Sequence, residues 1–122
     1  MYMKTIEDHN LETRLKTDLE DFGLKIDFNF QFKGYSKNYY GRYLPKDRVI
    51  IVYILDKENK RIPYEAILKT VIHEAIHHYQ HHHSQDFVRY KGVMHNEEFK
   101  RLENHYYKLA DLINYDLELV VN

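Results

Sequence analysis

Residues 71–80 read VIHEAIHHYQ and contain the pattern H-E-x-x-H. Residues four apart lie on one face of a helix, one turn above the other, so His73 and His77 can offer two imidazole nitrogens to one metal ion. Glu74 stands beside that face, where its carboxylate would reach a water bound to the metal. Zinc suits such a site because it accepts neutral imidazole and tolerates an open fourth position, at which the pKa of water falls to about 7. The pattern therefore predicts a zinc hydrolase with Glu74 as general base.

The pattern also has an ordinary explanation, in which the two histidines lie on a solvated helix face. The chain has nine histidines among 122 residues, so about one shuffled chain in twenty would contain H-E-x-x-H by accident. A helix around the motif and a third ligand further along the chain would favour the metal site.

The helix around the motif is predicted from Pro63 to about Gln80 or His83. Proline suits the first helical position, and an acidic residue such as Glu65 suits the first turn. Apolar residues fill one arc of this helix at a spacing of 3.6, and His73 and His77 project beside the arc. The arc consists of Ile67, Leu68, Val71, Ile72, Ala75, Ile76 and Tyr79.

The preceding half of the chain predicts a helix and a small sheet. Residues 5–22 carry a helical apolar stripe that ends at Gly23, and residues 24–33 (LKIDFNFQFK) alternate apolar and polar side chains as one strand does. Residues 38–44 and 48–55 flank a turn and predict a hairpin, of which 49–55 should be buried on both faces. We expect an α+β fold with an antiparallel or mixed, largely antiparallel sheet of about three strands packed on the motif helix.

The third ligand is predicted to be His95, at the start of a C-terminal helix. A loop over residues 84–94 would let that helix fold back, and three histidines plus water form a catalytic type of zinc site. The C-terminal glutamates could serve instead, although imidazole fits zinc better. The alternative third ligands are Glu97, Glu98 and Glu103.

Residues 115–122 alternate apolar and polar side chains and could form a last strand, a packing segment or a partner contact.

Further histidines follow the motif at helical spacing: His78, His81, His82 and His83. They form additional pairs four residues apart that could bind metal adventitiously. A solvated, frayed helix end is favoured over a second designed site.

The combination of H-E-x-x-H with HNEEF at residues 95–99 resembles the SprT-like zinc metalloproteases, the group that includes Spartan. The resemblance covers roughly residues 24–114. It implies a zincin-like fold, Zn²⁺ held by His73, His77 and His95, Glu74 as general base, and proteolysis, in some members of proteins crosslinked to DNA. The chain departs from the family at Asn96, where glycine is usual, and has no cysteine-rich ribbon. A glutamate as third ligand would instead resemble the ImmA/IrrE-like proteases.

Length and composition predict a single domain over residues 1–122, without disulfides because there are no cysteines. The sequence has no apolar run like a signal peptide or membrane span, so we expect a soluble, cytoplasmic protein. We further expect a monomer, whose substrate is a protein or peptide. The net charge of −1 gives no overall attraction to DNA. Residues 33–48 interleave basic residues with tyrosines and could follow a DNA backbone, although a charged edge strand is favoured. Alternatives to an enzyme are a structural zinc site and a module whose His-rich helix end captures metal nonspecifically.

Overall fold

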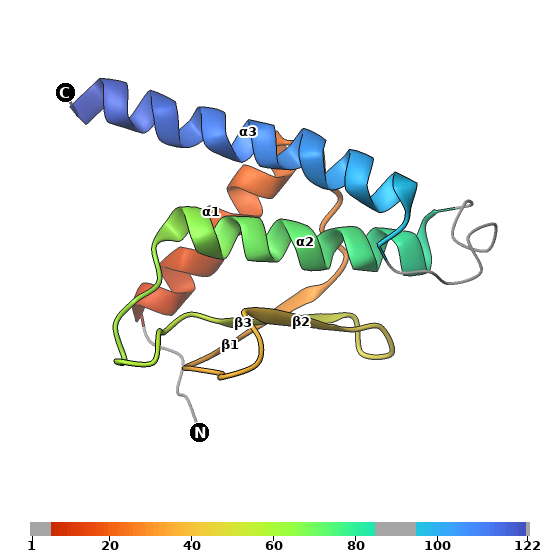
Figure 1. Ribbon diagram of the computed structural model, residues 1–122, viewed down its shortest axis with the longest axis horizontal. Helices are drawn as coiled ribbons and strands as arrows, with labels where there is room; N and C mark the ends of the chain where they lie inside the picture. The colour runs from red at the N-terminus through yellow and green to blue at the C-terminus, as the bar shows by residue number, and fades with distance from the viewer. Residues whose placement is uncertain (1–5, 85–94, 122) are drawn as a thin grey trace.

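The computed structural model describes residues 6–84 and 95–121, with side chains as far as residue 113. It is an α+β fold with three helices and a small mixed sheet of three strands (Figure 1). The elements follow in the order α1 (Ile6–Asp21), β1 (Asn29–Lys33), β2 (Gly41–Leu44), β3 (Val49–Tyr53), α2 (Tyr64–His82) and α3 (Glu97–Val121).

The sheet has the order β1-β3-β2, with β3 in the centre. β2 and β3 pair antiparallel, as the predicted hairpin requires. β1 pairs with β3 in parallel, from Asn29 opposite Val49 to Lys33 opposite Tyr53, so the sheet is mixed and not largely antiparallel. β2 lies on the edge opposite β1 and runs antiparallel to it, and β3 therefore runs in the same direction as β1 between them.

The predicted strand over residues 24–33 is too long, because only residues 29–33 are a strand. The pairing with β3 begins at Asn29, whose backbone N–H donates to the carbonyl of Arg48 at 2.9 Å. Residues 24–28 precede that pairing and have no strand beside them. Asp27 instead directs its carboxylate to the C-terminal end of α2.

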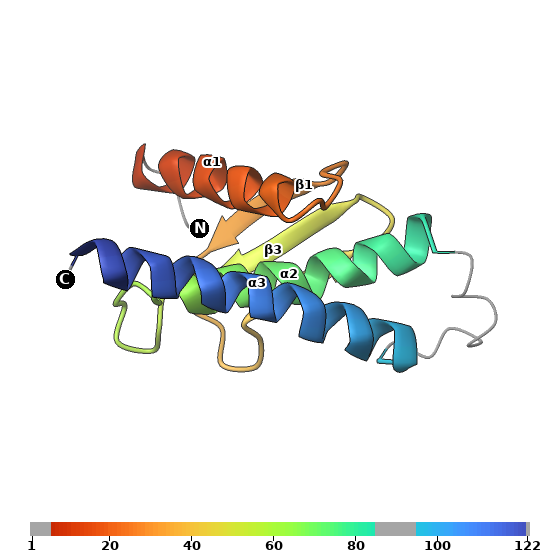
Figure 2. The same ribbon diagram turned by 90° about the horizontal axis from the view of Figure 1, so that it is seen from above.

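Helix α2 covers one face of the sheet, and α3 runs antiparallel along α2 on the side away from the strands (Figure 1). α1 lies on the same side of the sheet, apart from α3 (Figure 2). The core forms where the apolar arc of α2 meets the buried centre of β3 and the inner face of α1. Its fully buried members include Leu15, Leu19, Ile50, Val52, Ile54, Val71 and Ile72.

Two expectations about the helices change in the structure, and a third is not tested. Tyr79 is 37% exposed and does not belong to the buried arc, whereas His78 and Gln80 are buried. The final residues continue α3 to Val121, so the alternative of a last strand is wrong. The loop expected at 84–94 lies outside the described residues except for Ser84. Within the described residues, no helix combines the length and apolar character needed to cross a membrane.

Candidate metal centre

Three imidazoles converge between α2 and α3. His73 and His77 lie one turn apart on α2, and His95 lies just before α3. One ring nitrogen from each falls within 4.8 Å of the other two. The Nε2 atoms of His77 and His95 are 3.3 Å apart, and two nitrogens at about 2.05 Å from one tetrahedral zinc would be about 3.3 Å apart. The group has the spacing that a small metal ion requires.

Phe99 forms an apolar floor beneath the three imidazoles. Its side chain is 2% exposed. The centroid of its ring is 4.9 Å from that of His73, 4.6 Å from His77 and 4.8 Å from His95. Phe99 lies on the first turn of α3, so the packing of α3 against α2 sets the position of all three imidazoles.

Asn96 fixes the start of α3. Its Oδ1 accepts a hydrogen bond from the backbone N–H of Phe99 at 2.9 Å, which is the arrangement of an N-cap. The same oxygen accepts from Nε2 of Gln80 on α2 at 2.9 Å. Asn96 is 6% exposed. The residue that departs from the usual glycine of the SprT-like motif therefore joins the two helices that carry the histidines.

The three glutamates considered as third ligands have other positions. Glu103 Oε2 accepts from Nδ1 of His73 at 2.6 Å, which leaves the Nε2 lone pair of His73 available to a metal. Glu98 is buried and accepts from Nε2 of Gln80 at 2.9 Å and from Oγ of Ser84 at 2.7 Å. Glu97 is exposed. Among the described residues, the group around His73 and His77 includes His95 and none of these glutamates.

Burial changes the proton affinities of the two central groups. Glu74 is 8% exposed, and burial raises the pKa of its carboxyl although the nearby His73 lowers it. Its Oε2 lies 4.0 Å from Nε2 of His73. Burial, followed by the neighbouring His73 and His95, lowers the pKa of His77 to about 4. His77 is therefore neutral at neutral pH, as a metal ligand must be.

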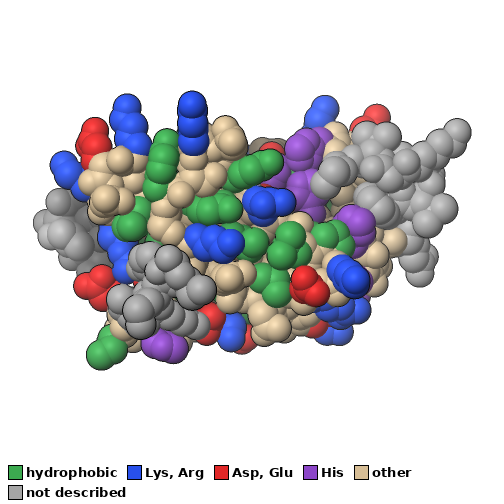
Figure 3. Space-filling view, turned by 90° about the horizontal axis from the view of Figure 1, so that it is seen from below, with side chains coloured by type: hydrophobic (Ala, Val, Ile, Leu, Met, Phe, Trp, Pro, Cys, Tyr) green, Lys and Arg blue, Asp and Glu red, His purple; other side chains and the backbone are tan. Residues whose placement is uncertain are grey.

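An open cavity of about 280 Å³ adjoins this group. β2 approaches α2 closely there, since a Cβ added at Gly41 would lie 3.4 Å from Cγ of Glu74. Tyr107 contributes from α3, and burial together with the Glu103 carboxylate raises the pKa of its phenol. A group of histidines with hydrophobic side chains beside it is visible on the face shown in Figure 3. The lining residues are Asn38, Tyr39, Tyr40, Gly41, Thr70, His73, Glu74 and Tyr107.

A second group, Asp27, His78 and His83, also brings possible ligand atoms within 4.8 Å. Nε2 of His78 donates to Oδ1 of Asp27 at 2.6 Å, and Nε2 of His83 donates to Oδ2 at 2.7 Å. These are the lengths of charge-assisted hydrogen bonds, shorter than the spacing of two ligands on one zinc. The hydroxyl of Tyr43 donates to Nδ1 of His78 at 2.5 Å. We therefore interpret this group as a hydrogen-bonded network.

The structure corrects the prediction of a solvated helix end for His78 and His82, whereas His81 and His83 are exposed. His78 is 2% exposed and links α2 to β2 and to residue 27. Nε2 of the half-buried His82 lies 3.2 Å from the carbonyl oxygen of Pro45, and His81 is exposed. The sequence analysis missed Asp27 and Tyr43 as partners because no local pattern relates residues 51 or 35 positions apart.

Residues 33–48 form the end of β1, a connection, β2 and a turn. Lys37, Arg42 and Lys46 are exposed, and the guanidinium of Arg42 lies 5.0 Å from the ring centroid of Tyr39. Tyr43 has an internal partner in His78. Arg42 lies on the edge strand β2, whereas Lys37 lies in the connection before it and Lys46 in the turn after it. DNA binding by this segment stays a prediction.

No family model, curated protein or solved structure matches this chain. The resemblance to the SprT-like proteases therefore rests on the two short motifs at residues 73–77 and 95–99. The function has to be inferred from the chemistry of the candidate site.

Proposed function

We propose that the chain is a zinc-dependent peptidase of the SprT-like type, with a zincin-like arrangement of α2, α3 and the sheet. The observation that carries the proposal is the convergence of His73, His77 and His95 beside a buried Glu74 and an open cavity. An accidental H-E-x-x-H on a solvated helix would supply neither the third imidazole nor the buried carboxylate.

The residues fit zinc in three respects. Neutral imidazoles suit it, and the low pKa of His77 keeps that ring neutral. The 3.3 Å separation of two Nε2 atoms matches a tetrahedral edge. Glu103 orients His73 from its far nitrogen, as carboxylates do for histidine ligands of metals. Zinc bound there would polarise a substrate carbonyl and lower the pKa of a water molecule.

The protein groups perform the proton transfers of peptide hydrolysis. Glu74 accepts a proton from the attacking water and returns it to the leaving amine as the C–N bond breaks. Burial raises the pKa of Glu74 toward the working range of a general base. The hydroxyl of Tyr107 stays protonated and donates to the Glu103 carboxylate in this structure, so it would have to turn away from Glu103 to donate to the substrate carbonyl oxygen as negative charge develops there.

The substrate is a polypeptide in an extended conformation. β2 is an outer strand of the sheet and passes beside Glu74 at Gly41, so its free edge can pair with a substrate strand and align it with the site. Proteins bound to DNA are suggested by the family resemblance. Replacing the basic residues of 33–48 by glutamate tests that choice, because unchanged retention on DNA would exclude this segment as the contact. The residues to replace are Lys33, Lys37, Arg42 and Lys46.

The decisive experiment measures metal content and peptide cleavage on tag-free protein purified without chelators. We expect one zinc per chain, its loss in His95→Ala, and its retention in the control His105→Ala, which removes an exposed histidine of α3. Glu74→Gln should keep the zinc and lose cleavage by at least about 100-fold. A wild-type chain without zinc, or zinc retained in His95→Ala, would contradict the three-histidine site. Zinc without any cleavage would identify a structural metal.

A further inference from the structure

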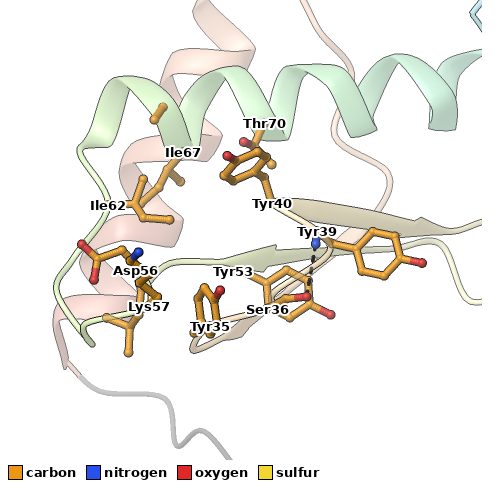
Figure 4. A pocket seen from close by; sticks show the side chains of 12 residues that line it. Tyr35, Ser36, Tyr39, Tyr40, Tyr53, Asp56, Lys57, Ile62, Ile67 and Thr70 are labelled. Atoms are coloured by element: carbon orange, nitrogen blue, oxygen red, sulfur yellow. Dashed lines mark hydrogen bonds between the residues drawn. The ribbon is translucent and has the colours of Figure 1, made fainter.

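A second cavity of about 270 Å³ lies next to the cavity at the candidate metal centre. The two cavities share Tyr39, Tyr40 and Thr70 as lining residues. In Figure 4, Ile62 and Ile67 border the second cavity on one side, Tyr40 and Thr70 on another, and Tyr35 and Tyr53 lie below. The two cavities therefore adjoin at Tyr39, Tyr40 and Thr70, and the second lies along the N-terminal half of α2 from Glu74.

The walls of this cavity carry apolar surface that the fold leaves open. Tyr35 is 48% exposed, Tyr39 is 49% exposed and Tyr40 is 77% exposed. They are half of the six large hydrophobic side chains that are exposed in the described part of the chain. Such a local concentration of exposed apolar side chains is typical of a binding site.

Asp56 and the exposed Lys57 are the two charged residues that line this cavity, and Asp56 is engaged within its own turn. The carboxylate of Asp56 accepts hydrogen bonds from the backbone N–H groups of Glu58 at 2.8 Å and Lys60 at 3.0 Å, within its own turn. This partnering lowers its pKa and engages Oδ1. The volume is just below the range of about 300–1,000 Å³ usual for small-molecule sites, and it suits one large side chain.

The cavity lies at a defined distance from the bond that would be cleaved. Thr70 and Ile67 precede Glu74 by four and seven residues, which is about 6 Å and about 10 Å along a helix. An extended chain advances about 3.3 Å per residue. A substrate paired with the edge of β2 would therefore reach the cavity with a side chain two or three residues from the reacting carbonyl.

We propose that this cavity selects a large apolar side chain, aromatic or branched aliphatic, two or three positions from the cleaved peptide bond. The proposal rests on the peptidase function proposed above and names its substrate preference. Burial of one such side chain predicts a preference of roughly 10- to 100-fold in kcat/KM over a serine at the same position.

The test uses the zinc-loaded full chain and a mixture of peptides from a denatured protein, with cleavage sites identified by mass spectrometry. Ala66→Phe places a ring in the cavity from an exposed position of α2. Lys108→Phe introduces the same ring at an exposed position of α3 as the control. We expect the apolar preference in the wild type and in Lys108→Phe, and its loss in Ala66→Phe with cleavage next to small residues unchanged.

A binding arm separates this proposal from the peptidase function. Random peptides are selected on zinc-loaded Glu74→Gln protein and on the same protein carrying Ala66→Phe. Cleavage without an apolar preference would overturn the cavity proposal and leave the peptidase intact. If no cleavage occurs, the peptidase function fails, and enrichment of apolar residues that Ala66→Phe abolishes would still support the cavity. Selection without such enrichment would overturn it.

Discussion

At Gly41, β2 lies against Thr70 and Glu74 of α2, next to the candidate site. In Gly41→Ala, the new Cβ would lie 2.6 Å from Cγ2 of Thr70 and 3.1 Å from the backbone oxygen of Ile51. Carbon atoms in favourable contact are about 3.5–4.0 Å apart, so β2 and α2 must separate by about 1 Å or distort. Overpacking of this kind costs about 1–3 kcal/mol. Replacing glycine reduces the entropy of the unfolded chain and offsets about 0.4–1 kcal/mol. The net loss of stability should be about 1–2 kcal/mol.

Thr70→Ser removes Cγ2 and tests this reasoning directly. In the Thr70→Ser background, the clash with Thr70 is gone, and Gly41→Ala should cost clearly less, with only the 3.1 Å contact to the backbone oxygen of Ile51 remaining. The four proteins of this cycle are unfolded in urea and followed by far-UV circular dichroism, with the free energy of unfolding obtained by linear extrapolation. The coupling between the two changes should exceed about 0.5 kcal/mol, beyond the usual error of additivity. Equal effects of Gly41→Ala in both backgrounds would refute the close contact between β2 and α2.

Three further predictions concern the network around His78, the candidate metal centre and the start of α3. Asp27→Asn should destabilise the protein by about 1–2 kcal/mol above pH 4. Burial raises the pKa of Asp27, but hydrogen bonds from His78 and His83 outweigh this effect and lower the pKa from 3.8 to about 2. A carboxyl group whose pKa is lower in the folded state stabilises the fold at pH values above its unfolded-state pKa. The difference in the free energy of unfolding between the two proteins should therefore fade as the pH falls toward 2. A difference that grows in acid would contradict this. Tyr107→Phe should lower kcat about 10- to 100-fold with little change in KM, measured on one peptide, if its hydroxyl acts only on the developing charge; an effect confined to KM would assign Tyr107 to binding. Asn96→Ala should cost about 1 kcal/mol in urea unfolding through loss of the N-cap of α3, and an effect below about 0.3 kcal/mol would argue against the cap.

Local patterns in the sequence predict much of the fold. The apolar arc of residues 67–76 and the hairpin around Pro45 are each predicted by residues that are close together in the sequence. The structure confirms both. The strand that pairs with β1 could not be predicted in this way. Alternation specifies which side chains share a face of the sheet, but not which strand lies beside them. The same alternation made residues 24–28 resemble a strand, although no strand lies opposite them.

In the candidate site, too, local spacing predicts some contacts, and others depend on how distant elements pack. A spacing of four residues brings His73 and His77 together on any helix, so their proximity followed from the sequence. His95 was predicted from its place at a helix start after a loop long enough to fold back, and the structure places it with the other two. The contact between Glu103 and His73 and the network around His78 depend on how α2, α3 and β2 pack. Those contacts join residues at least 30 positions apart, and no local period encodes them.

The shortness of β2 has a consequence for self-association. An exposed edge strand is a template for other copies of the same chain, and long flat edges favour fibril growth. β2 has four residues, carries the exposed Arg42 in its middle, and is followed at once by Pro45, which has no N–H to donate. A second copy could add few backbone hydrogen bonds along this edge and would bring another arginine to the first. The edge of β2 is therefore a poor template for ordered aggregation.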